Sequence, residues 1–431
     1  MKTPLALSVR FYSKLSLRTQ RKLESLRYTF IPTPYATRLL IVMLNPQPNP
    51  LYYSPEHEQF RQTLRTFVAR EITPFVNEWD EAEEFPRELY RQAAAIGLLG
   101  MGYPEEYGGT PADIFYSLIA ADELAQGGSG GVLASLLSHT IAAPPILAAG
   151  SAEMKARVLP AILRGEKIAA LAITEPAGGS DVASLKTTAV REGDFYLVNG
   201  EKTFITSGMR ADYFTVAVRT NPQDKGAGGV SLLLIERDTP GFTRTPLKKM
   251  GWWCSDTAHL HFDNCRVPVT NLIGPENQGF RLTMLNFNAE RLGLAANACA
   301  FAKVCFADAL AWARERKTFG APLIERQVIR HKLVDMAMKI EATRATLEDL
   351  AYRVEHQLGA PNLLVAQTSM LKNFATQTMQ FCADQAVQIL GGMGYIRESR
   401  VERIYREVKV NMIGGGAEEI MKDLAARQMK F

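Results

Sequence analysis

The spacing of hydrophobic positions divides the chain into a helical region, a region of strands and a second helical region. Ser54, followed closely by Glu56 and Glu58, predicts a helix N-cap with acids in the first turn. Beyond it, apolar residues recur at spacings of four, three and one, as on one helix face, at Phe60, Leu64, Phe67 and Val68. Helical patterns interrupted by glycine or proline continue to about residue 165.

Near residue 169 the pattern changes to short apolar segments separated by turn residues. Phe195–Val198 and Thr203–Ile205, joined by Asn199-Gly200, predict a hairpin built on an Asn-Gly turn. Further β segments are expected at 213–218, 230–235 and 257–262. We therefore predict a small, mostly antiparallel β domain over residues 166–280.

Helical spacing returns in three long stretches, 281–316, 323–357 and 361–390, whose lengths suit a bundle of antiparallel neighbours. The second stretch repeats apolar residues at spacings of four, three and four, at Ile329, Leu333, Met336 and Ile340. The predicted fold class is α+β. Its expected parts are a basic extension at 1–50, a helical domain at 51–165, a β domain at 166–280 and a helical bundle at 281–431.

Composition and charge are those of a globular protein with a distinct N-terminal segment. The 431 residues are 47% hydrophobic and 22% charged, and the net charge is +4. Residues 1–50 carry eight Lys or Arg and a single acid, which leaves the rest of the chain mildly acidic. Nucleic-acid binding is therefore not indicated.

The basic segment allows two interpretations. It has the composition of a mitochondrial transit peptide, which would place the protein in the mitochondrial matrix. Alternatively, it is an upstream extension of a bacterial reading frame that begins nearer Met43, which would make the protein cytoplasmic. We favour the second, because residues 1–42 lack a strong amphipathic pattern. The apolar run 39–44 is too short to span a membrane.

The cysteines and histidines do not indicate a metal site. The five cysteines form no Cys-x-x-Cys pair, and their odd number favours free thiols in a reducing compartment. The six histidines show no metal-ligand spacing either. We predict no bound metal.

The segment with the clearest chemical pattern is Ile173–Ser184. Pro176 fixes one backbone angle, while Gly178 and Gly179 allow angles that other residues avoid. Such a loop can present main-chain N–H groups to an anionic or polar ligand. The same composition is also compatible with an ordinary tight turn.

This segment resembles a signature of the acyl-CoA dehydrogenase family, and four other segments extend the resemblance over roughly residues 55–431. They are Gly200–Gly208, Asn288–Arg291, Arg316–Gly320 with Gln327, and Gln388–Tyr395 followed by Glu398, Arg403 and Glu407. The resemblance implies FAD as cofactor, an acyl-CoA substrate and the three-domain fold of that family. Its reaction removes an α-proton from the thioester and transfers a β-hydride to flavin N5, which gives a trans-2-enoyl-CoA.

The resemblance also implies residue roles. By the resemblance, one set of residues is expected to bind the flavin of the same chain: Leu171, Ile173, Thr174, Ser180, Phe204, Ile205, Thr206, Ala417 and Glu419. A second set is expected to contact the FAD of a neighbouring subunit: Arg316, Thr318, Gln327, Gln388, Gly391 and Gly392. The substrate is expected at Ser180, Asn288, Arg291, Gly415 and Gly416. Because two chains would build each site, we expect at least a homodimer and favour a homotetramer.

The catalytic base is where this chain departs from many family members. The C-terminal position that usually carries the base is Gly415, which has no side chain but can donate its N–H to the thioester oxygen. In the long-chain and isovaleryl branches the base lies instead on a helix, in a segment that matches Asn288–Arg291. We predict Glu290 as the base, with Glu418 as the rival.

The leading function is an acyl-CoA dehydrogenase that passes electrons to an electron-transfer flavoprotein. Two alternatives are an acyl-CoA oxidase or flavin monooxygenase on the same fold, and a non-catalytic scaffold or assembly protein. The chain lacks the extra C-terminal sequence of acyl-CoA oxidases, and it retains Glu290, Ser180 and Arg316, which weigh against a scaffold.

Overall fold

The computed structural model describes residues 48–224 and 226–431, without the side chains of Leu285 and Asn286. The interpretations of the basic segment 1–50 and of the apolar run 39–44 therefore fall outside the described residues, apart from positions 48–50.

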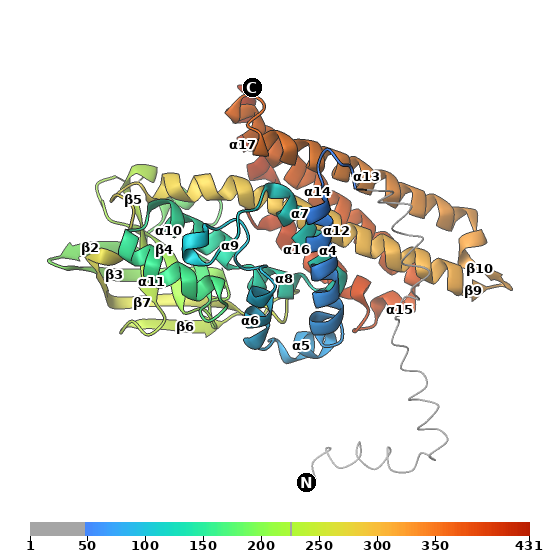
Figure 1. The fold of residues 1–431 in the computed structure, drawn as a ribbon, viewed down its shortest axis with the longest axis horizontal. Coiled ribbons are helices and arrows are strands. Elements are labelled where there is room, and N and C mark those ends of the chain that lie inside the picture. Colours follow the sequence, from blue (N-terminus) through green and yellow to red (C-terminus); the bar gives the residue numbers. More distant parts are fainter. Residues whose placement is uncertain (1–47, 225) are drawn as a thin grey trace, which may run out of the picture. The chain divides into compact units, whose positions relative to one another are not determined.

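The described chain passes from helices to a sheet and back to helices (Figure 1), which confirms the predicted fold class. The helices before the sheet are α4 (Pro55–Phe67), α5 (Val76–Ala82), α6 (Glu88–Ala95), α7 (Ile114–Leu124), α8 (Gly130–Leu136), α9 (His139–Ala142), α10 (Pro144–Ala149) and α11 (Ala152–Leu163). Ser54 is the N-cap of α4, as predicted. Its backbone N–H donates to Nδ1 of His57 at 3.0 Å, which satisfies one donor at the helix start.

The middle of the chain forms one eight-stranded sheet with the order β6-β7-β3-β2-β4-β5-β8, and β1 pairs with β4. The strands are β1 (Ala169–Ala172), β2 (Thr188–Glu192), β3 (Phe195–Thr206), β4 (Tyr213–Arg219), β5 (Val230–Glu236), β6 (Phe242–Pro246), β7 (Thr257–Pro268) and β8 (Leu272–Ile273). All pairings are antiparallel except those of β4 with β1 and, at one position, with β2. The mostly antiparallel sheet is therefore confirmed.

The predicted hairpin at Asn199-Gly200 is wrong. Both residues lie inside the continuous strand β3, where the pairing with β7 shifts register between Val198 and Gly200. Gly200 has φ +141°, so the glycine serves a β-bulge rather than a turn. The actual hairpin joins β2 to β3 through a two-residue turn between Glu192 and Phe195, in which Gly193 adopts φ +61°.

The helices after the sheet agree with the three predicted stretches. They are α12 (Gly279–Glu315), α13 (Gln327–Glu355), α14 (Pro361–Leu390), α15 (Gly392–Tyr395), α16 (Arg400–Ile413) and α17 (Glu418–Met429). A short hairpin, β9 (Lys317–Thr318) and β10 (Ala321–Pro322), links α12 to α13. By length and composition α12 is apolar enough to cross a membrane, but 78% of its most apolar window is buried inside the described fold. Burial of this kind is typical of a core helix.

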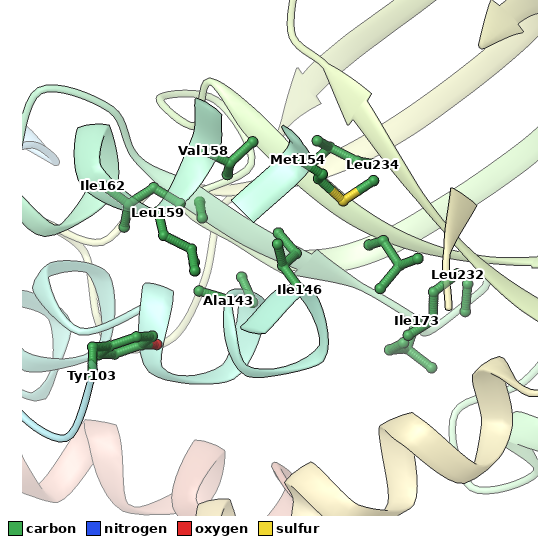
Figure 2. Close-up of a cluster of buried hydrophobic side chains, with 14 of the residues drawn as sticks. Tyr103, Ala143, Ile146, Met154, Val158, Leu159, Ile162, Ile173, Leu232 and Leu234 are labelled. Carbon is green, nitrogen blue, oxygen red and sulfur yellow. The ribbon is translucent and has the colours of Figure 1, made fainter. Parts of the chain in front are cut away.

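An apolar cluster joins the sheet, the helices before it and the start of α12 (Figure 2). Met154 and Val158 of α11 pack with Leu232 and Leu234 of β5, and Ile173 belongs to the same cluster. Three residues of α12 pack against it, Phe280, Leu282 and Phe287. Burial of each such side chain contributes on the order of 2 kcal/mol, so the cluster fixes the start of α12 against the loop after β1.

Candidate active site

Glu290 lies in the first third of α12, in an environment that disfavours its charge. The residue is partly buried, and its Oε2 is fully buried without a hydrogen-bond partner. Loss of hydration raises the pKa of Glu290 to about 7, although Arg291 and Lys372 act in the opposite direction. A carboxyl group with this pKa can take up or release a proton near neutral pH.

The structure brings Gly415 to the same point. Gly415 lies in the turn between α16 and α17 with φ +66°. A Cβ added to it would lie 3.8 Å from Oε1 of Glu290 and 2.6 Å from Cδ1 of Leu294. Within residues 48–224 and 226–431, no acceptor is found for the Gly415 N–H. The residue that carries this free N–H donor therefore lies next to the carboxyl group of Glu290.

Two buried cations hold the main chain of this turn. Nε of Arg291 donates to the Gly415 carbonyl at 3.1 Å, and its Nη1 donates to Oδ1 of Asn288 at 3.2 Å. Nζ of Lys372, on α14, donates to the carbonyls of Met412 at 3.0 Å and Gly416 at 2.8 Å. Arg291 and Asn288, both predicted as substrate contacts, are thus joined to each other and to the turn. Lys372 was not predicted, because a lone lysine in a helical pattern usually lies on a solvated face.

The rival carboxylate is bound elsewhere. Glu418 accepts from Nζ of Lys422 at 2.7 Å and from Nε2 of Gln377 at 2.8 Å. These partners, Lys422 first, hold the pKa of Glu418 below its ordinary value. A carboxylate stabilised in its charged form is a poorer base near neutral pH than one with a raised pKa. Ala417 and Glu419, predicted near the cofactor, flank Glu418 at the start of α17, and Glu419 is exposed.

A buried ion pair fixes the loop at 173–184. Glu175 accepts from the backbone N–H groups of Lys186 at 2.6 Å and Thr187 at 2.9 Å, and from Nζ of Lys202 at 2.7 Å. Lys202, on β3, is fully buried and also donates to the Ile173 carbonyl at 3.0 Å. Burial lowers the pKa of Lys202 to about 8, against the attraction of Glu175. Sequence reasoning missed this pair, since only the fold brings residues 175 and 202 together.

Hydrogen bonds also join the two segments that are expected to bind the flavin, the loop after β1 and the end of β3. The Thr203 N–H donates to the Thr174 carbonyl at 2.9 Å, so the loop after β1 runs against the end of β3. At this end Phe204 adopts φ +60° and is 69% exposed, whereas Ile205 is buried. Leu171 and Thr206 are partly buried, and Ser180 is exposed. Phe204 therefore presents its ring to solvent from a backbone conformation that residues other than glycine seldom adopt.

Six predicted cofactor residues lie at the other end of the bundle. Arg316 directly follows α12 and lies 26 residues after Glu290, which corresponds to about 39 Å along the helix axis. Figure 1 shows β9, β10 and α15 at the end away from the sheet. All but Thr318 of the residues Arg316, Thr318, Gln327, Gln388, Gly391 and Gly392 are exposed. The structure therefore does not bring these residues to the Glu290 site of their own chain.

Comparison with known proteins agrees with this architecture. The family models for the acyl-CoA dehydrogenase N-terminal, middle and C-terminal domains match residues 54–166, 170–265 and 277–430. The chain is 36% identical to an acyl-CoA dehydrogenase of Bacillus subtilis (strain 168) over 382 residues, which cover 88% of this chain and 99% of the relative. It is also 36% identical to the mitochondrial long-chain specific acyl-CoA dehydrogenase of Rattus norvegicus over 379 residues, or 88% of this chain and 87% of the relative.

A solved structure gives the same result. A putative acyl-CoA dehydrogenase from Mycobacterium smegmatis superimposes with a TM-score of 0.85 at 46% sequence identity, and the match covers 88% of this chain and 99% of that chain. The family models together span most of the chain, in the order of its helical, β and helical parts. The chain therefore belongs to the acyl-CoA dehydrogenase family, FAD-dependent oxidoreductases that act on the CH–CH bond of acyl-CoA thioesters.

Proposed function

We propose that Glu290 removes the α-proton of the acyl-CoA thioester. The observation that carries this proposal is the carboxyl group of Glu290, whose Oε2 is buried without a partner and whose Oε1 would lie 3.8 Å from a Cβ on Gly415. A base works best when its pKa lies near the operating pH, and burial brings the pKa of Glu290 to about 7. Glu290 and Gly415 together match the long-chain and isovaleryl branches of the family.

Removal of the α-proton places negative charge on the thioester oxygen, and the turn supplies a donor for it. The Gly415 N–H has no acceptor within the described residues, while Arg291 donates to the Gly415 carbonyl and Lys372 donates to the carbonyls of Met412 and Gly416. A preorganised donor aimed at a developing oxyanion contributes about 3 kcal/mol to a transition state. Asn288, Arg291, Gly416 and Ser180 are proposed to contact the rest of the acyl-CoA.

The residues around the loop fit the cofactor of the family. Glu175 and Lys202 satisfy each other inside the protein, so the loop can offer its own main chain and the hydroxyls of Thr174 and Ser180 to a ligand. With Leu171, Ile173, Phe204, Ile205 and Thr206 they would hold the flavin, and the start of α17 with Ala417 and Glu419 would lie at its margin. When bound, FAD supplies the acceptor for the substrate's β-hydride.

The distal residues support a site shared between subunits. Arg316 lies about 39 Å from Glu290 along α12, and Phe319 at the tip of the adjoining hairpin is 99% exposed. An exposed guanidinium can bind a pyrophosphate with two hydrogen bonds. We propose that Arg316, Thr318, Gln327, Gln388, Gly391 and Gly392 contact the FAD of a neighbouring copy, in at least a homodimer and by preference a homotetramer.

The electron acceptor and the compartment are also proposals. An electron-transfer flavoprotein is the partner that fits the family, and we propose it rather than direct reaction with oxygen. Relatives occur in bacteria and in mitochondria, and we propose the cytoplasm of a bacterium. Rapid peroxide formation by the substrate-reduced protein would instead assign the chain to the oxidase class.

The base is tested by two matched variants, Glu290→Gln and Glu418→Gln, each of which removes one charge and keeps the side-chain length. Both should retain FAD, measured by visible absorbance. Glu290→Gln should lose at least a hundredfold in substrate-dependent dye reduction, because general-base catalysis contributes about 10²–10⁴. Glu418→Gln should stay within a few fold of wild type. Full turnover in Glu290→Gln would overturn the assignment.

A further inference from the structure

Lys372 is a fully buried lysine in the C-terminal bundle. It lies on α14 with a relative exposure of 0%. An ammonium group is unstable in such a place unless hydrogen bonds replace its hydration. Lysine is among the residues least often buried, and a methionine or leucine would fill the same space without this penalty. The burial of this charge therefore calls for a reason other than packing.

The contacts of Lys372 converge on one structure, the turn that carries Gly415. Its Nζ donates to the carbonyl of Met412, in the last turn of α16, and to the carbonyl of Gly416. The final carbonyls of a helix lack intrahelical partners and carry the negative end of its dipole, so a cation is favourable there. Lys372 thus bonds to the main chain before and after Gly415, while Arg291 donates to the Gly415 carbonyl itself.

We propose that Lys372 is a positioning residue for the reaction: it holds the Gly415 N–H beside Glu290, and its charge favours the ionised form of that base. This inference rests on the proposed role of Glu290. The geometry assigns two separable effects to one side chain. Loss of the hydrogen bonds frees the turn, and loss of the charge changes the proton affinity of the base.

The charges around the pair support the second effect. Glu290 is faced by Arg291 from its own helix and by Lys372 from α14, and both lower its pKa against the larger effect of burial. Lys372 is faced by Arg291, Glu290 and Glu418. Burial, followed by Arg291, lowers the pKa of Lys372 to about 8, so most of the group remains charged at pH 7. The positive charge is therefore present where Glu290 titrates.

The test is the pH dependence of flavin reduction by substrate in the holoenzymes of wild type, Lys372→Met and Lys372→Arg. Lys372→Met should raise the apparent pKa by about half a unit or more, because an opposite charge has been removed. It should also slow reduction at pH 7 by about tenfold or more, because the turn is misplaced. Lys372→Arg keeps the charge and should keep the apparent pKa near that of wild type.

A matched control is Lys430→Met, which removes a lysine charge from the exposed residue that follows α17. Its pH profile should equal that of wild type. An unchanged apparent pKa in Lys372→Met, whatever its rate, overturns the proposal. If that variant does not give folded holoenzyme, Lys372→Gln, which is also uncharged but retains donors, is judged by the same shift. If Glu290→Gln is active, the proposed base fails; if it is inactive and the Lys372 variants do not shift, only this inference fails.

Discussion

The raised pKa of Glu290 predicts a specific pH dependence for the reductive half-reaction. With a pKa of about 7, about 9% of the molecules carry the active carboxylate at pH 6 and about 91% at pH 8. The rate constant for flavin reduction should therefore rise about tenfold between these values. A solvated glutamate with a pKa near 4.3 would be almost fully ionised throughout, and the rate would change by only about 2%.

The assay is stopped-flow absorbance of the flavin at saturating acyl-CoA, from pH 5.5 to 9, at constant ionic strength. Saturation matters because it reports ionisation in the complex rather than in the free protein. Glu290→Gln should give a low rate without the rise near pH 7. This comparison also separates Glu290 from Glu407, whose pKa burial likewise raises to about 7 but which bonds to the Gly130 N–H. A flat wild-type profile from pH 6 to 8, or a rise that persists in Glu290→Gln, would show that Glu290 is not the group that titrates.

Three further predictions concern stability and the turn. Burial shifts the pKa of Glu290 from 4.5 to about 7. Ionisation of Glu290 should therefore destabilise the fold by about 3 kcal/mol above pH 7 and not at all below pH 4.5. In denaturant unfolding, Glu290→Gln should be more stable than wild type at pH 8 and equally stable at pH 4. Gly415→Ala forces a Cβ to within 2.6 Å of Leu294 at φ +66°, and should lower turnover about tenfold or more in steady-state assays while FAD is retained. Glu175→Gln leaves Lys202 buried without its anionic partner and should cost about 3–5 kcal/mol in denaturant unfolding, much of which the double variant Glu175→Gln/Lys202→Met should restore; an unchanged unfolding midpoint in the single variant would contradict this account.

The sequence predicted the long helices well because their signal is local. Apolar residues at helical spacing, such as Leu333 and Met336, identify α13 without knowledge of its neighbours. The Asn199-Gly200 signal failed for the converse reason. A turn dipeptide was outweighed by the pairing of β3 with β7 along most of its length, and the strand absorbed it as a bulge.

The candidate site was predicted in part, and the division again follows sequence separation. Resemblance pointed to Glu290 and Gly415, 125 residues apart, and the structure places them side by side. The resemblance could not show that Oε2 of Glu290 lacks a hydrogen-bond partner, since that depends on every side chain around the carboxyl group. Nor does any local pattern distinguish Lys372 from a surface lysine, because its burial arises from the packing of four helices.

The length of α12 has a consequence for mixed oligomers. One continuous helix carries Glu290 in its first third and is followed directly by Arg316, and we propose that these residues serve the active sites of two different subunits. A Glu290→Gln subunit then lacks the base of its own site but still supplies Arg316 to the site of its neighbour. An Arg316→Ala subunit keeps its own base but supplies no arginine to its neighbour. Co-expression of these two inactive variants should regenerate some intact sites, so that two defective copies of the gene complement each other.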